Sequence, residues 1–324
     1  MPQAVPIKMM PVPTPFSVGA INTYLVEDDP LTLVDCGPNS GTALNALEGM
    51  LRDNGRRVED LERIVVTHQH MDHIGLAEIL ADRSGADVIC IDPLVEWLAD
   101  FQQRMEAEDA FAVKVMLHHG IPEDITTALA AVTGRTRAWG NPVNDAHGVH
   151  HDEVLEFASR SWRVHHRPGH SPSDTTFHDE QSGELLAGDH LLGRISSNPV
   201  IHRPLNGDES VRPRALIDYI ESMKKTAALD LNVVYAGHGE PITDHKSLIA
   251  ERLRMHERRA NKIETLLKGR ELTAHEIATE IWGKIAITQA YLTVSEVVGH
   301  VDILVSEGRA SEHDDGKVVR FSAA

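Results

Sequence analysis

The stretch THQHMDHIG at residues 67–75 constrains the fold of this chain more than any other feature. It follows the apolar run IVV and brings four ionisable side chains into six positions: His68, His70, Asp72 and His73. Such a crowd is poor material for a buried strand or helix unless its members share a task. Two histidines two residues apart project to one side of an extended segment. The pattern therefore predicts a loop that leaves a strand and can face two metal ions.

Three further segments place a polar side chain at the end of an expected strand. His170 follows SWRVHHR, Asp189 follows GELLAG and His238 follows NVVYAG, each with a glycine beside it. Open α/β sheets gather functional groups at the carboxyl ends of strands, and glycine permits the sharp turns needed there. Together the candidates offer imidazole and carboxylate donors and no thiolate. This donor set suits two divalent metal ions, Zn²⁺ first, with Mn²⁺ or Fe as alternatives.

The order of the expected elements indicates an α/β protein. A hairpin is predicted at 21–36, then a helix at 40–53, a strand at 63–66, a helix at 73–83 and a strand at 86–91. Alternating strands and helices are typical of a layered sheet covered by helices.

The later pattern divides the chain into parts. A run of helices from about 93 to 150 predicts a helical insertion within a catalytic domain at 1–245. A charged linker helix is expected at 246–270. Residues 271–324 show the pattern helix, helix and hairpin, which is the arrangement of a small winged-helix domain.

Charge and cysteine content limit the partners and the compartment. The net charge is −18, and nearly all of the excess acid lies before residue 251. An acidic surface repels phosphate backbones, so the composition disfavours nucleic acid as a partner. Only two cysteines are present, Cys36 and Cys90, and no apolar run is long enough to span a membrane. We therefore expect a cytoplasmic protein with no membrane partner.

The segment THQHMDH, followed in order by PGHS, GDH and GHG, resembles the metallo-β-lactamase superfamily over roughly residues 15–245. The resemblance implies an αββα sandwich with a binuclear metal site. It also implies the ligands of each metal: His68, His70 and His170 for the first, Asp72, His73 and His238 for the second, and Asp189 as the bridge. Asp35, in LVDCG, matches the strand-end aspartate that supports the ligands from behind in this family.

The same resemblance implies a binuclear metal-dependent hydrolase. Two dications lower the pKa of a bridging water, which yields a metal-bridging hydroxide without a separate general base. Asp72 would orient this hydroxide and pass a proton to the leaving group. Glyoxalase II-like thioesterases and lactonases share the hairpin NTYLVEDDPLTLVDCG and the Asp72 form of the motif. RNase Z-like enzymes keep the same seven ligands, so the ligands alone do not identify the substrate.

Features outside the ligands favour an acyl ester, thioester or lactone as the small-molecule substrate. The acidic catalytic part disfavours a polyanion. The insertion could roof an apolar acyl pocket, or pack a core of its own, with four large side chains: Trp97, Phe101, Phe111 and Met116. Contacts to the substrate are predicted from residues that closely follow a ligand: Ser173, His190, Arg194 and Asn198.

Two alternatives stay open. A metal-dependent endoribonuclease is the first, because the C-terminal unit resembles the winged helix of a superfamily branch that includes an endoribonuclease-like protein. The second is a nucleic-acid-binding or partner-binding winged-helix protein with a vestigial hydrolase domain, which the intact ligand set disfavours. The acidic turn EHDDGK favours a structural role for the unit, including a homodimer contact, over nucleic-acid recognition.

Overall fold

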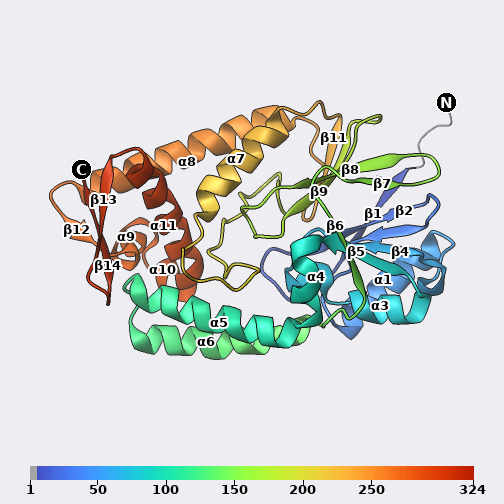
Figure 1. The fold of residues 1–324 in the computed structure, drawn as a ribbon, viewed down its shortest axis with the longest axis horizontal. Coiled ribbons are helices and arrows are strands. Elements are labelled where there is room, and N and C mark those ends of the chain that lie inside the picture. The colour runs from blue at the N-terminus through green and yellow to red at the C-terminus, as the bar shows by residue number, and fades with distance from the viewer. Residues whose placement is uncertain (1–5) are drawn as a thin grey trace.

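The computed structural model describes residues 6–324, and two facing sheets form its larger part (Figure 1). The first sheet has six strands in sequence order, antiparallel from β1 to β3 and parallel from β3 to β6. They are β1 (Ile7–Val12), β2 (Ile21–Val26), β3 (Thr32–Val34), β4 (Arg63–Val65), β5 (Asp87–Ile91) and β6 (Ala146–Val149).

The second sheet has five strands in the order β11-β10-β9-β8-β7, and only β10 and β11 run parallel. They are β7 (Val154–Glu156), β8 (Ser161–His166), β9 (Thr175–Asp179), β10 (Glu184–Gly188) and β11 (Val233–Ala236). Trp162 and Phe177 of this sheet share one buried core with Leu33 and Ile64 of the first. The two sheets therefore pack face to face.

Helices cover the outer faces of both sheets (Figure 1). On the first sheet lie α1 (Gly41–Asp53) and α3 (Ala77–Ser84); on the second lie α7 (Ala215–Ala227) and α8 (His245–Leu267). The helix α1 shows how the sequence sets such an element. Ser40 accepts a hydrogen bond from the Ala43 amide at its start, and Leu47 and Leu51 lie buried on one face. The layers therefore run helix, sheet, sheet, helix.

The helix predicted at 73–83 is interrupted in the structure. A short α2 (Met71–Ile74) ends at Gly75, and α3 begins at Ala77. A Cβ atom on Gly75 would lie 2.2 Å from the Asn39 amide nitrogen and 2.3 Å from the Trp139 carbonyl oxygen. The backbone breaks here because it must pass between two other segments, a contact that the helical pattern does not reveal.

The helical insertion contains α4 (Asp92–Ala99), α5 (Phe101–His118) and α6 (Glu123–Thr136), but it is shorter than predicted. Residues Ala146–Val149, which we placed inside it, form β6 and pair with β5 at the sheet edge. Their sequence AHGV is short and lacks an apolar alternation, so it gives no strand signal.

The large side chains of the insertion lie in two buried clusters. Trp97 and Phe101 are buried in the core between the sheets. Phe111 and Met116 are buried together with Ile121 of the insertion itself and with residues of the C-terminal part. The insertion thus packs a core of its own only in part, because it also joins two other parts of the protein. The roof over an acyl pocket stays a prediction.

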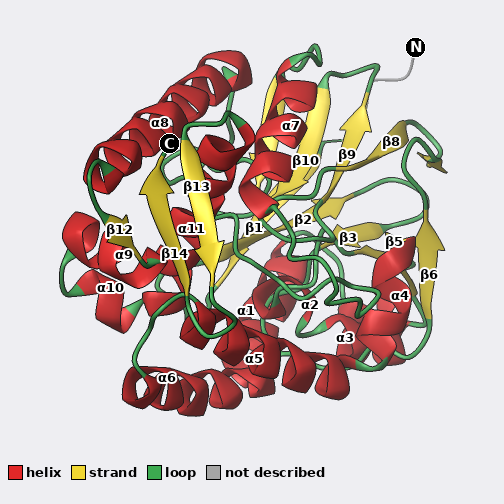
Figure 2. Cartoon of the chain, turned by 60° about the vertical axis from the view of Figure 1, so that its left-hand side comes forward, coloured by secondary structure: helices red, strands yellow, loops and turns green. Residues whose placement is uncertain are grey.

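The C-terminal part contains a small antiparallel sheet in the order β12-β14-β13 beside three helices (Figure 2). Its elements are β12 (Glu271–Leu272), α9 (Ala274–Trp282), α10 (Ile285–Thr288), α11 (Ala290–Ser306), β13 (Ala310–Asp314) and β14 (Val319–Ala323). The Thr273 side chain caps α9 as predicted, whereas β12 and α10 were not expected. Within the described residues, no helix combines the length and apolar character needed to cross a membrane.

Replacing Phe111 tests the contact between the insertion and the C-terminal part. Phe111→Ala removes a ring that is 7% exposed and should lower the free energy of unfolding by about 3 to 5 kcal/mol. Denaturant unfolding measures the change. Val132→Ala, at an exposed position of α6, should alter stability by less than about 1 kcal/mol. Equal stability of the two variants would contradict the packing described here.

Candidate metal centre

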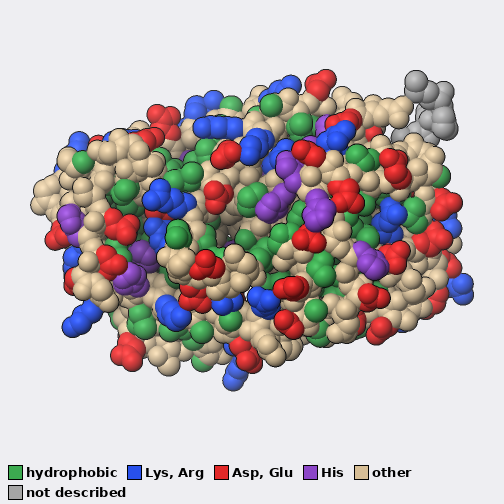
Figure 3. All heavy atoms as spheres, in the orientation of Figure 1, with side chains coloured by type: hydrophobic (Ala, Val, Ile, Leu, Met, Phe, Trp, Pro, Cys, Tyr) green, Lys and Arg blue, Asp and Glu red, His purple; other side chains and the backbone are tan. Residues whose placement is uncertain are grey.

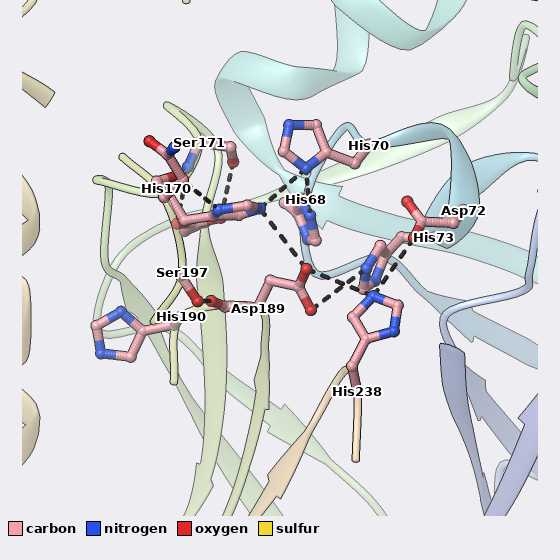
Figure 4. A network of polar contacts seen from close by, with 12 residues as sticks. His68, His70, Asp72, His73, His170, Ser171, Asp189, His190, Ser197 and His238 are labelled. Atoms are coloured by element: carbon pink, nitrogen blue, oxygen red, sulfur yellow. Dashed lines mark hydrogen bonds and ion pairs between the residues drawn. The ribbon is translucent and has the colours of Figure 1, made fainter. Parts of the chain in front are cut away.

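The structure gathers the seven predicted ligands where strands of both sheets end (Figure 4). The first sheet contributes the loop after β4 and the helix α2, with His68, His70, Asp72 and His73. The second sheet contributes the loops after β8, β10 and β11, with His170, Asp189 and His238. Segments that are far apart in the sequence thus meet at one point between the sheets.

Three histidines form one group. The Nε2 atoms of His68 and His170 each lie 3.0 Å from Nδ1 of His70. Adjacent donors around a tetrahedral zinc ion stand about 3.3 Å apart, given metal–nitrogen bonds of about 2.0 Å. The three nitrogens converge at a separation that fits a single ion.

A second group contains Asp72, His73 and His238. The Asp72 carboxylate lies 3.4 Å from His238 Nε2. Asp189 lies between the groups, with Oδ1 3.6 Å from His73 Nε2 and Oδ2 3.7 Å from His170 Nε2. Oδ2 also lies 3.6 Å from His238 Nε2, so this one carboxylate faces donors of both groups.

Several inward-facing atoms have no hydrogen-bond partner. They are buried, and they include His73 Nε2, His238 Nε2 and Asp189 Oδ1. An unsatisfied polar atom costs free energy when it is removed from water. A divalent metal ion would satisfy these atoms together, so the residues present fit metal binding.

The pKa shifts of the candidate ligands also favour metal binding. Burial, reinforced by the neighbouring His73, lowers the pKa of His68 well below its usual range, so its ring is neutral and can ligate a metal. Burial alone would raise the pKa of Asp189, but His73, His238 and His170 together outweigh it and hold that pKa below its usual range. Burial also opposes protonation of His73, yet Asp35 and Asp189 raise its pKa well above the usual value. The carboxylates of Asp35 and Asp189 thus favour a positive charge at the His73 ring.

Asp35 supports the ligands from behind, where the family resemblance places it. Its Oδ2 accepts hydrogen bonds from His73 Nδ1 at 2.7 Å and from the Thr67 hydroxyl at 2.8 Å. The Thr67 oxygen lies 3.0 Å from His68 Nδ1 and can accept its proton. Both rings thereby keep their Nδ1 proton on the side of Asp35 and Thr67 and turn Nε2, the atom available to a metal ion, toward the centre.

The turn that carries His238 is tied to the start of the chain. His238 Nδ1 donates to the Ala20 carbonyl at 2.8 Å. The Asn22 side chain donates to the carbonyls of Ala236 and Gly239, at 3.0 and 2.7 Å. The hairpin β1–β2 therefore fixes a ligand more than 200 residues away in sequence.

Asp35→Asn tests this support. Asparagine also tolerates the left-handed backbone of residue 35, with φ of 54°, but its amide group would oppose the donors that the carboxylate accepts. Metal affinity should fall by about 10- to 100-fold. Competition with a chromogenic chelator measures it, with the exposed Asp53→Asn as the control. Unchanged affinity in Asp35→Asn would show that the carboxylate does not hold the ligands.

The four predicted substrate contacts have different surroundings. Ser173 is fully buried, and its hydroxyl oxygen accepts from the Gln69 amide at 3.0 Å, so it braces the ligand loop. His190 is also fully buried; its Nε2 contacts the Thr226 hydroxyl at 2.9 Å, and burial lowers its pKa to about 3. Figure 4 shows its ring turned away from the ligands. We therefore no longer expect Ser173 or His190 to contact a substrate.

The other two predicted contacts differ from each other. Arg194 is exposed, in the loop that follows Asp189. Asn198 touches a ligand through its backbone, since its carbonyl accepts from His170 Nδ1 at 3.0 Å. Its side chain donates to the Leu292 carbonyl at 3.2 Å. Asn198 thus orients a ligand, while Arg194 remains a predicted substrate contact.

Two residues near the ligands were not anticipated. His202 Nε2 lies 3.2 Å from His70 Nε2, and His202 Nδ1 lies 2.9 Å from Glu108 Oε1. His202 stands in a loop without a strand-end pattern, and Glu108 is one of three acidic residues on α5. No local signal in the sequence distinguishes either one.

Comparison with known proteins agrees with this geometry. Residues 17–238 match the family model of the metallo-beta-lactamase superfamily. The chain is 33% identical over 315 residues to the "Probable metallo-hydrolase YqjP" of Bacillus subtilis, covering 96% of this chain and 95% of that protein. The crystal structure of the metallo-beta-lactamase family protein TTHA1429 from Thermus thermophilus superposes with a TM-score of 0.82 at 27% identity, over 98% of both chains. A beta-lactamase domain protein from Burkholderia ambifaria gives a TM-score of 0.82 at 25% identity, over 99% of this chain and 94% of that one. This chain belongs to the metallo-beta-lactamase superfamily.

Proposed function

We propose that this protein is a binuclear metal-dependent hydrolase that cleaves an acyl ester, thioester or lactone. The observation that carries the proposal is the position of Asp189, whose carboxylate lies within 3.7 Å of His170 in the first group and of His73 and His238 in the second. A carboxylate that faces donors of both groups is suited to bridge two ions.

Each residue has a role in this proposal. His68, His70 and His170 would hold one ion, Asp72, His73 and His238 would hold the other, and Asp189 would face both. When bound, two divalent ions, Zn²⁺ first and Mn²⁺ or Fe as alternatives, would supply a water of lowered pKa and Lewis-acid polarisation of the carbonyl group. Asp72, beside His238, would orient the attacking water, take up its proton and pass that proton to the leaving group.

Surface charge supports a small acyl substrate over RNA. The net charge is −18, and on the face in Figure 3 the basic side chains are scattered among acidic ones. An RNA-binding surface needs clustered Lys and Arg to displace counterions. Both Cys36 and Cys90 are buried free thiols, which favours a reducing compartment such as the cytoplasm.

We further propose that the C-terminal part is a winged helix in a structural role. A nucleic-acid reader of this type lays one exposed helix in a groove. Here α11 is buried along most of its length, with Val294, Val298 and Val301 in the core that it shares with the insertion. The turn between β13 and β14 carries Asp314 and Asp315.

The test combines metal analysis with a substrate panel of thioesters, lactones, aryl esters and single-stranded RNA. We expect two metal ions per chain and turnover of at least one acyl compound. That turnover should change little between about 50 and 200 mM salt, whereas RNA cleavage would fall steeply over this range. Cleavage of RNA alone, with this salt dependence, would favour the endoribonuclease instead.

A further inference from the structure

One short loop contacts two ligands of the first group. Residues 198–203 lie between Asp189 and α7. The Asn198 carbonyl accepts from His170 Nδ1 at 3.0 Å, and four residues later His202 Nε2 lies 3.2 Å from His70 Nε2. The two rings are therefore oriented from a single segment.

The hydrogen bonds that link His70, His202 and Glu108 allow only one assignment of donors and acceptors. Its Nδ1 faces the other two histidines of the group, so as a ligand this atom carries no proton and Nε2 does. The Nε2 proton must then be donated to His202 Nε2. His202 accordingly carries its own proton on Nδ1 and donates it to Glu108 at 2.9 Å. The carboxylate thus sets the tautomer of His202, and His202 sets that of His70.

The loop is held by two parts of the chain that contribute no ligand. From the insertion, Glu108 on α5 accepts from the Arg203 amide at 3.1 Å in addition to His202. From the C-terminal part, α11 binds Ile201 on both sides: the Tyr291 hydroxyl donates to its carbonyl, and Ser295 Oγ accepts from its amide at 3.3 Å.

The second group of ligands is supported elsewhere. Asp35 and Ala20, both from the first sheet's side of the chain, hold His73 and His238. Loss of the contacts around residues 198–203 therefore leaves the surroundings of those two rings intact. The two metal positions should respond differently to changes in this loop.

We propose that His202 is a positioning residue for His70, oriented by Glu108, and that the insertion and α11 hold the loop so that the first metal position is formed. The proposal rests on the ligand assignment above. His202 is not itself a ligand, because its Nε2 accepts the His70 proton and its Nδ1 is bound to Glu108.

The experiment titrates metal-free protein with Zn²⁺ and with Co²⁺, by chelator competition and by the visible Co²⁺ spectrum. In His202→Ala, affinity at one of two metal positions should fall by about 10- to 100-fold while the other changes by less than about twofold. His202→Gln should recover most of the loss, because its amide can accept from His70 and donate to Glu108. Tyr291→Phe should also lower the metal affinity of that position, by a smaller factor than His202→Ala.

A matched control distinguishes loss of the contact between Glu108 and His202 from loss of a negative charge on α5. Glu106→Gln changes an exposed carboxylate on the same helix as Glu108 and should leave both affinities unaltered, whereas Glu108→Gln should weaken the first position. Wild-type affinity at both positions in His202→Ala and Glu108→Gln, or an equal loss at both positions, would overturn the inference. Should His202→Ala fail to fold, Glu108→Gln and Tyr291→Phe still decide it. Wild-type protein that binds no metal would instead overturn the proposed function.

Discussion

Asp189→Ala should abolish hydrolysis and leave at most one metal ion bound. Removing a carboxylate that faces both groups of candidate ligands takes away the proposed bridge and would leave two bound cations to repel each other. We expect the turnover number to fall by about a thousandfold or more, since the activated water depends on both ions. Elemental analysis of the purified variant and its rate on the best acyl substrate measure the two effects.

Two comparisons make this result interpretable. Asp230→Ala removes a fully exposed carboxylate just before β11 and should match the wild type in metal content and rate. Full activity of Asp189→Ala in a metal-free preparation would contradict the proposed mechanism. Near-native thermal stability of the variant, measured with metal removed from both proteins, shows that the loss is not one of folding.

Gly237→Ala should disrupt the same centre by adding a single methyl group. A Cβ atom at residue 237 would lie 2.2 Å from Asp189 Oδ1 and 2.9 Å from His73 Cε1. The backbone cannot retreat easily, because the Gly237 amide donates to Gly188 and its carbonyl accepts from the Asn22 amide, both at 2.7 Å. The Asp189 carboxylate must therefore turn away from its position between the ligands.

A displacement of about 1 Å in a catalytic group costs about a hundredfold in rate. We expect at least that loss in Gly237→Ala, together with weaker metal binding, from kinetics and chelator competition. Gly193→Ala is the matched control, because a Cβ atom there would meet its nearest neighbour at an ordinary 3.6 Å. If both variants kept wild-type activity, the close approach at residue 237 would have no functional importance.

The meeting of the seven candidate side chains can be anticipated because their pattern is local. His68, Asp189 and His238 each lie close behind an apolar run, and the ends of strands meet in a layered sheet. The supporting contacts are not local. Glu108 reaches His202 across 94 positions, and nothing in either segment anticipates the meeting.

The errors have a related cause. His190 was predicted to contact substrate because it follows Asp189, but the chain turns directly after β10, where the His190 amide donates to the Ala187 carbonyl at 3.0 Å. The turn directs the His190 ring away from the ligands, and the ring is buried beside Tyr219. In the same way, the apolar faces of Trp97 and Phe111 indicate burial without indicating which part of the protein covers them.

The ties between Asn22 and the turn around His238 affect how the protein is made. The Asn22 side chain and the Ala236 carbonyl are 214 residues apart in sequence, so they meet only after the chain has been synthesised to that point. Pairings so distant form late, because loop closure is costly. The second metal position that we propose would be incomplete in a nascent chain that ends before His238. Metal uptake should thus follow assembly of both sheets, and bound metal would report that folding of this part is complete.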